Sequence, residues 1–168
     1  VFAEIAGDAA FNANLRPPIR DCEIEYPTGD RIGCDEALQI ADLGIVPRNQ
    51  VRFAWWGAEE SGLLGAEYYV DNLSKRDIKN IALNLNFDMI GYADPTPEDL
   101  DVMAKISNPP CEPFCDWFIA IADSYTTLPT NKRMMNDNQN SDHGPFWDNG
   151  YLALTGIEDF WPGNPHYH

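Results

Sequence analysis

The feature that most constrains the fold is the junction at residues 51–65, where an apolar run ends in two adjacent acids and then takes on helical spacing. The run at residues 51–56, VRFAWW, is β-branched and aromatic and too short for a helix, so it predicts a buried strand closed by Gly57. Glu59 and Glu60 follow at its carboxyl end. Ligands of α/β sheets bind beyond the carboxyl ends of strands, and two adjacent carboxylates repel each other there. The junction therefore predicts a site for something cationic.

A second acid stands at the end of the next predicted strand. Residues 80–90 alternate apolar with small or amide residues at period two, which is typical of a strand, and Asp88 lies near its end. Between the two strands, residues 61–73 have helical spacing. That helix is expected to turn its apolar residues toward the sheet: Leu63, Leu64, Tyr68 and Val70. A right-handed parallel crossover would bring Glu60 and Asp88 to the same edge of the sheet.

The rest of the chain favours an α/β class, with three α/β/α layers and a mixed, mainly parallel central sheet, as one domain over residues 1–168. Residues 1–33 are the least defined part and are expected to be mostly loops. Further expected elements are a short helix at 35–43, a surface loop at 92–101, a helix at 113–125, a short strand at 132–135, a short helix opened by 141–146 and ended by Gly150, and a last strand at 151–155.

Charge and hydropathy exclude several classes of partner. The net charge of −16 would repel nucleic acid and anionic membrane surfaces. The apolar runs are far shorter than the roughly 20 residues that cross a bilayer. The chain is therefore expected to bind neither nucleic acid nor membranes.

The four cysteines form two local pairs, Cys22 with Cys34 and Cys111 with Cys115. In an exported protein both pairs are expected to be disulfides, whereas in a cytosolic protein they would stay reduced. The spacing of four between Cys111 and Cys115 is helical and places their Cα atoms near the upper end of the bonding range.

Carboxylates and an imidazole at the rim of a sheet are a ligand set that zinc accepts. Glu60, Asp88 and His168 are therefore candidate ligands, and Glu59 is a candidate base that takes a proton from water beside the metal. Simpler interpretations stay open at this point. The acids can be solvated surface or turn caps, and the terminal His166 and His168 can be disordered.

Four segments resemble the secreted bacterial zinc aminopeptidases, the leucyl-type exopeptidases with two co-catalytic zinc ions. They are residues 52–65, residues 85–91, residues 141–146 and the closing His-Tyr-His. Glutaminyl cyclases are single-zinc relatives of these enzymes. The resemblance implies the roles of general base for Glu59 and of zinc ligands for Glu60, Asp88 and His168. It also implies a supporting position beside the ligands for Asp142 and His143.

The chain departs from that family's pattern upstream of the paired acids. The family carries an upstream histidine ligand and a bridging aspartate, but no histidine precedes His143 here, and Glu25 is a weak candidate for the bridge. A fragment of such a peptidase and a degenerate member both fit. We therefore expect the chain as given to hold at most one zinc tightly and to have little activity.

Three functions follow as hypotheses. The first is removal of N-terminal residues from peptides by a zinc-dependent, exported aminopeptidase. The second is a catalytically impaired binding module that keeps the fold. The third is a single-zinc acyltransferase like a glutaminyl cyclase. Zinc content separates them, with about two, zero and one ion per chain respectively.

Overall fold

The computed structural model describes residues 11–12, 43, 49, 51–90, 99–107, 109–136, 141–158 and 164–165. The chain divides into two compact units, Val1–Gly57 and Ala58–His168, which we describe separately. The helix expected at residues 35–43 lies almost entirely outside the described residues, as do Cys22, Glu25 and Cys34. The single-domain organisation stays a prediction.

The described part of the first unit is a short antiparallel ladder. Strand β1 (Phe11–Asn12) pairs with β2 (Arg52–Phe53), and Phe11 lies opposite Phe53. The strand expected over residues 51–56 is thus two residues long, because residues 54–57 join no ladder in the described structure. Strand β2 belongs to this ladder and β3 to a different sheet, so the described pairing does not contain the predicted parallel crossover.

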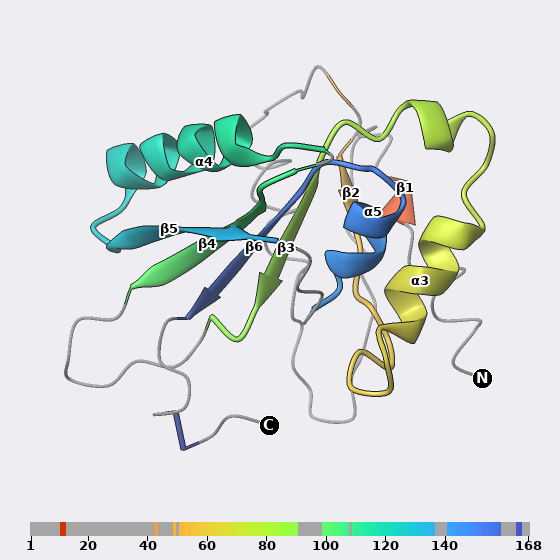
Figure 1. Cartoon of the computed structure of the whole chain (residues 1–168), viewed down its shortest axis with the longest axis horizontal. Helices are drawn as coiled ribbons and strands as arrows, with labels where there is room; N and C mark the ends of the chain where they lie inside the picture. Colours follow the sequence, from red (N-terminus) through yellow and green to blue (C-terminus); the bar gives the residue numbers. More distant parts are fainter. Residues whose placement is uncertain are drawn as a thin grey trace. The chain divides into compact units, whose positions relative to one another are not determined.

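The second unit is built on a four-stranded mixed sheet with the order β3-β6-β4-β5 (Figure 1). Its strands are β3 (Asn84–Asp88), β4 (Leu100–Lys105), β5 (Thr130–Met135) and β6 (Ala153–Glu158). Strand β3 is parallel to β6 and β4 is parallel to β5, while β4 and β6 are antiparallel. The mixed, mainly parallel sheet predicted from the sequence is confirmed.

Strand β4 corrects the end of the surface loop expected at residues 92–101, because the strand already begins at Leu100, and it occupies residues 102–105, for which no element was expected. Residues 92–98 of that loop lie outside the described residues. Five of the six residues of β4 are buried, since the strand lies between β5 and β6. The signal was present, because Leu100, Val102 and Ala104 alternate with Asp101, Met103 and Lys105. The acids and prolines just before this run obscured its period.

The register divides the sheet into an apolar face and a polar face, because paired residues share a side and neighbours along a strand alternate. The apolar face carries Leu85 and Phe87 of β3, Leu154 of β6, and Leu100, Val102 and Ala104 of β4. The polar face carries Asn84, Asn86 and Asp88 of β3, Thr155 of β6, and Asp101 and Lys105 of β4. Buried polar side chains need hydrogen-bond partners or a ligand. A functional site is therefore expected on the polar face of the sheet.

Helix α4 (Glu112–Tyr125) covers the apolar face along β4 and β5 (Figure 1). Pro113 lies in its first turn, as the sequence predicted. Phe118 reaches the ring of Phe87, with 6.0 Å between the ring centroids. Cys115 is the α4 residue that is fully buried against the sheet.

The disulfide expected between Cys111 and Cys115 is absent, and both residues are buried free thiols. Cys111 caps the first turn of α4 and donates its S–H to the carbonyl of Pro109, while Cys115 donates to the carbonyl of Val102. The two thiols therefore point to separate acceptors. Burial raises the pKa of Cys115 to about 11, so this thiol stays protonated and unreactive at neutral pH.

Helix α5 (Gly144–Asp148) lies on the polar face and is anchored there by Trp147, which is 1% exposed. The indole Nε1 of Trp147 donates to the carbonyl of Ala153 at 2.9 Å, and the Lys105 Nζ lies 5.9 Å from the centre of its ring system. Gly150 ends the helix in a left-handed conformation with φ 77°, as its position predicted.

Helix α3 (Leu64–Asp71) packs against α5. Its buried residues are Gly65, Ala66 and Val70, while Leu64 and Tyr68 are each 50% exposed. The prediction that large apolar residues form the packing face of α3 was therefore wrong in part, because Val70 is the one predicted residue that is buried. The small residues Gly65 and Ala66 instead bring α3 close to α5.

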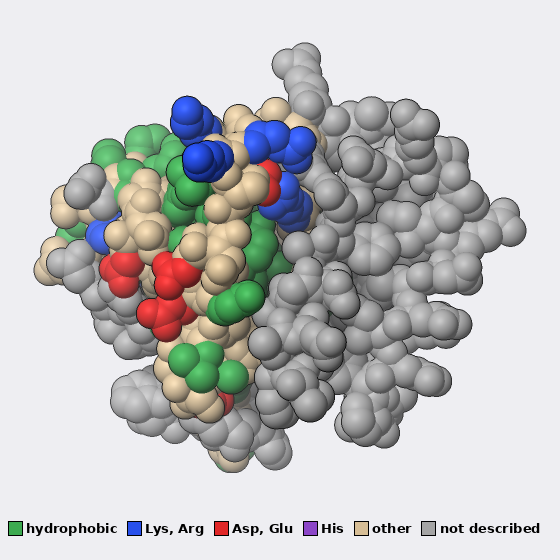
Figure 2. Space-filling view, turned by 90° about the vertical axis from the view of Figure 1, so that its right-hand side faces the viewer, with side chains coloured by type: hydrophobic (Ala, Val, Ile, Leu, Met, Phe, Trp, Pro, Cys, Tyr) green, Lys and Arg blue, Asp and Glu red, His purple; other side chains and the backbone are tan. Residues whose placement is uncertain are grey.

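In the described part of the chain, no helix is long and apolar enough to cross a membrane. The surface is not uniformly acidic in spite of the net charge. Figure 2 shows Lys and Arg gathered at the upper end of one face, with Asp and Glu below them. Exposed Lys75, Arg76 and Lys79 surround the short 3-10 helix η1 (Asp77–Lys79).

Replacing Trp147 tests the anchoring of α5. We expect Trp147→Ala to lower the free energy of unfolding by about 3–5 kcal/mol, because a fully buried indole and its hydrogen bond are lost. Trp117→Ala is the matched control, since Trp117 is 53% exposed on α4 and should cost about 1 kcal/mol or less. Urea unfolding followed by circular dichroism measures both, and equal losses would refute the anchoring role.

Candidate metal and catalytic site

The candidate site lies where β3 and β6 end side by side. Asp88 is the last residue of β3 and pairs with Ile157 of β6 in parallel register. The next residue, Met89, accepts a hydrogen bond at its carbonyl from the Glu158 N–H at 3.1 Å. The carboxyl end of β3 is thus held to β6 one residue beyond Asp88, which fixes the backbone from which Asp88 projects.

Three acids from separate segments converge at this edge. Asp142 precedes α5 and is 8% exposed, and its Oδ1 has no hydrogen-bond partner. The pKa of Asp142 is raised to about 7, mainly by burial and in smaller part by the negative charges of Glu59 and Asp88. Asp142 is thus a buried carboxyl that two other acids approach closely enough to affect its charge.

The segment that carries Asp142 is tied to the polar face of β3. The Asn86 side-chain amide donates to the Ser141 hydroxyl at 2.8 Å, and both residues are buried. Asn86 precedes Asp88 by two positions and so shares its face of the sheet. This hydrogen bond, which the sequence analysis missed, links the backbones that position Asp88 and Asp142. Asn84, Asn86 and Asp88 occupy every second position of the strand, and this pattern could have predicted a polar face that needs hydrogen-bond partners.

His143 is 2% exposed, and neither ring nitrogen has a hydrogen-bond partner. Its ring meets Trp147 edge to face, with 4.3 Å between centroids. Burial lowers the pKa of His143 to about 4, so the imidazole is neutral at physiological pH. His143 therefore supplies no positive charge to the nearby acids.

Backbone strain borders the acids. Ala58, directly before Glu59, has φ 58°, and Met89, directly after Asp88, has φ 47°. Leu63, which caps α3, has φ 60°, and its N–H donates to the Glu59 carbonyl at 2.8 Å. Left-handed conformations of such residues cost about 1–2 kcal/mol each and concentrate at functional sites. The fold thus fixes the backbone beside Glu59 and Asp88 in conformations that are locally unfavourable in free energy.

The donor set fits a divalent cation. Carboxylate oxygens are zinc ligands, and a cation would offset the negative charges of Glu59 and Asp88, which add to the effect of burial on the pKa of Asp142. Within the described residues, no three His, Cys, Asp or Glu side chains are grouped to hold a metal by themselves. Glu60 is exposed beside Glu59, while His168 and Glu25 lie outside the described residues. The shared metal centre of Glu60, Asp88 and His168 therefore stays a prediction.

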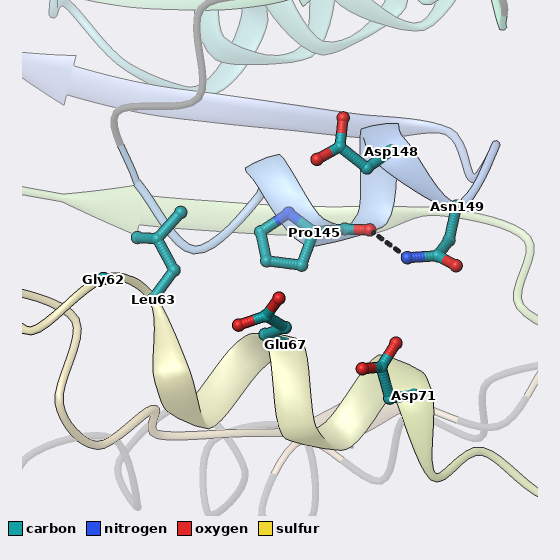
Figure 3. Close-up of a pocket in the computed structure, with 7 residues that line it drawn as sticks. All are labelled: Gly62, Leu63, Glu67, Asp71, Pro145, Asp148 and Asn149. Atoms are coloured by element: carbon teal, nitrogen blue, oxygen red, sulfur yellow. Dashed lines mark hydrogen bonds between the residues drawn. The ribbon is translucent and has the colours of Figure 1, made fainter.

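A separate hollow lies between α3 and α5 (Figure 3). Its acidic side chains are Glu67 and Asp71 of α3 and Asp148 of α5, and all three are exposed. Glu59, Asp88 and Asp142 do not line it. The hollow and the convergent acids are thus different features of the second unit.

Comparison with known proteins decides the family. The profile described as peptidase family M28 matches residues 33–168. The chain belongs to this family. Membership confirms the resemblance to zinc aminopeptidases and makes the chain part of a family of hydrolases that act on peptide bonds.

Individual M28 relatives agree with this assignment. The chain is 35% identical to leupeptin-inactivating enzyme 1 of Streptomyces exfoliatus over 73% of this chain and 26% of that protein. It is 61% identical to an aminopeptidase of Pseudomonas aeruginosa over 35% of this chain and 11% of that protein. A zinc aminopeptidase structure from Bacillus subtilis is 29% identical, with a TM-score of 0.56 over 72% of this chain and 29% of that one. The chain thus spans less than a third of the length of each of these relatives.

Asp142 and His143 are adjacent and buried, and they should affect the stability of the metal-free protein with opposite pH dependences. The pKa of Asp142 is raised from 3.8 to about 7, so its contribution to stability is present at low pH and is lost as the pH rises toward 7. The pKa of His143 is lowered from 6.5 to about 4, so its contribution is present above pH 6.5 and is lost as the pH falls toward 4. The contribution of Asp142 is about 4 kcal/mol and that of His143 about 3 kcal/mol, and the two oppose each other between pH 4 and 6.5.

Variants separate the two contributions. In Asp142→Asn the free energy of unfolding should fall on acidification from pH 7.5 to 4.5, and in His143→Phe it should rise. Urea unfolding of metal-free protein at both pH values measures this. Identical pH profiles for the two variants would show that neither group titrates as its surroundings indicate.

Proposed function

We propose that the protein is a zinc-dependent aminopeptidase that releases N-terminal residues from peptides. The observation that carries this proposal is the convergence of Glu59, Asp88 and Asp142 at one strand edge with a pKa of Asp142 near 7. The M28 relatives named as aminopeptidases support it.

Zinc would be held by Glu60, Asp88 and His168. When bound, it supplies Lewis acidity that polarises the scissile carbonyl and lowers the pKa of water at the site. Glu59 takes the proton from the attacking water and delivers it to the departing amine. Asp142 and His143 support the ligands from the segment before α5, since Ser141 is hydrogen-bonded to Asn86.

The same acids explain why the substrate is an N-terminus. The α-ammonium group of a peptide is cationic at neutral pH, and a concentration of carboxylates at the site attracts it. The interior of a peptide chain lacks that charge. Electrostatics therefore favours cleavage from the end of the chain.

We further propose that the protein is exported and that Cys22 and Cys34 form a disulfide. Both cysteines are close in sequence, and oxidation would close a short loop. Cys111 and Cys115 stay reduced because both thiols are buried on α4 and directed at separate carbonyls. Thiol titration of the denatured protein should therefore find two free thiols, and four would contradict the export proposal.

The role of Glu59 can be tested by one isosteric change. Glu59→Gln should lower kcat for a leucine anilide by about 10²–10⁴-fold, because the proton acceptor is lost, while zinc content stays unchanged. Glu67→Gln is the matched control, since Glu67 is an exposed acid on α3 outside the convergent group. Full activity of Glu59→Gln would remove it from the mechanism.

Zinc content tests the metal centre and its completeness. After dialysis we expect this chain to retain at most one zinc per chain, because Glu60 and His168 share one site and Asp88 lacks an upstream histidine partner in this sequence. Asp88→Asn should leave this one zinc bound, because Asp88 belongs to the second, incomplete site. Two tightly held ions would show that residues 1–33 supply ligands, and complete absence of zinc would favour the binding module.

A further inference from the structure

A short segment after helix α3 is basic and has no part in the proposed mechanism. Lys75, Arg76 and Lys79 are exposed around η1, and we name these three residues the basic ridge. They are half of the six Lys and Arg residues of the second unit. The other half is either buried or bound to acids: Lys105, Lys132 and Arg133. In the described second unit, positive charge that acids do not neutralise is therefore concentrated in the ridge.

The turn that carries the ridge is held by its own hydrogen bonds. The Asp77 N–H donates to the Ser74 hydroxyl at 3.1 Å, and this hydroxyl donates to the Asp77 carboxylate at 2.9 Å. Asp77 also lies 3.7 Å from the Arg76 guanidinium, but neither lysine of the ridge is in an ion pair among the described residues. The exposed Ile78 adds apolar surface to the turn. Such a turn loses little conformational entropy on binding, so it is suited to contact a partner.

The hollow between α3 and α5 has the opposite charge at one end. Asp71 is the last residue of α3 and Asp148 is the last residue of α5, and neither helix has a basic residue in its last turn. Figure 3 shows both residues toward the end of the hollow where Asn149 lies. The C-terminal end of a helix carries partial negative charge, so a carboxylate there is unfavourable and a cation is favourable. The acidic end of the hollow therefore favours a basic partner.

The ridge and the acidic end of the hollow are neighbours of opposite charge. Three residues, 72–74, separate Asp71 from Lys75 in the chain. On the face shown in Figure 2, Lys and Arg side chains lie above Asp and Glu side chains. Two such regions make a surface that is complementary to itself, because a second copy turned by 180° sets its ridge on the acidic end of the first copy and its acidic end on the first ridge. The attraction is then made twice in one contact.

We propose that two copies of the chain associate through this face, with the basic ridge of each copy bound to Asp71 and Asp148 of the other. The inference goes beyond the proposed function and does not depend on zinc, since Glu59, Asp88 and Asp142 do not line the hollow. The net charge of −16 opposes association at long range. At about 0.15 M ionic strength the Debye length is about 8 Å, so this repulsion is screened while ion pairs in contact persist. Exposed ion pairs contribute little each, so the dimer is weak and reversible.

Charge reversal tests the interface in sedimentation velocity experiments on the full chain at about 0.15 M ionic strength. The wild-type chain should form a concentration-dependent dimer. A ridge variant, Lys75→Glu with Lys79→Glu, should raise the dimer Kd by about 100-fold or more, because like charges then meet across the contact. A hollow variant, Asp71→Lys with Asp148→Lys, should do the same, and it should fold because a cation at a helix C-terminus is favourable.

A mixture of the two variants gives the deciding result. In the mixed dimer the reversed ridge meets the reversed hollow and the other contact is native, so the Kd should return to near the wild-type value. Ala120→Glu with Thr127→Glu is the charge control, since both residues are exposed on or just after α4, and its Kd should stay near the wild-type value. A mixture that stays monomeric, an undiminished dimer in the ridge variant, or an equal loss in the control would each overturn the inference. A wild-type chain that is monomeric up to about 1 mM would overturn it as well.

Discussion

Repulsion between carboxylates at the carboxyl edge of β3 is the constraint on which the rest of the second unit depends. Asp142 lies buried within reach of the charges of Glu59 and Asp88, and the pKa of Asp142 rises to about 7 as a result. Left alone, such a group of acids would favour separation. The fold opposes this with the ladder between β3 and β6, the Asn86–Ser141 hydrogen bond and the left-handed turns at Ala58 and Met89. Holding these three acids close together thus lowers the free energy of unfolding of this part of the protein.

The two faces of the sheet explain how one small unit accommodates both a core and this charge. Val102, Ala104 and Leu154 are buried on the apolar face, which α4 covers along β4 and β5. On the other side, Asn86 is hydrogen-bonded to Ser141 before α5, and the buried Trp147 of α5 donates to the Ala153 carbonyl of β6. The polar face is buried although its side chains are polar. Electrostatic interactions are stronger there than in water, because the local dielectric constant is low.

Much of this could be predicted from the sequence, and the misses have physical causes. The acids Glu59 and Asp88 were identified because each follows an apolar run, and strand ends in α/β sheets collect ligands. The packing face of α3 was misjudged because helix contacts depend on close approach, which Gly65 and Ala66 permit and a hydrophobicity pattern does not record. The proximity of Asp142 to Glu59 and Asp88 depends on contacts between segments far apart in the chain, for which a single sequence carries no local signal. His168 and Glu25 remain predictions of the sequence alone.

The Asn86–Ser141 hydrogen bond couples the strand end to the segment before α5. A cation held by Asp88 would, through this hydrogen bond, also restrict the backbone at Asp142. The entropic cost of immobilising these acids is met when the chain folds and not again when the cation arrives. Affinity for the cation then depends on how rigid β3 already is, so a mutation in the apolar core under α4 can change metal binding without touching a ligand.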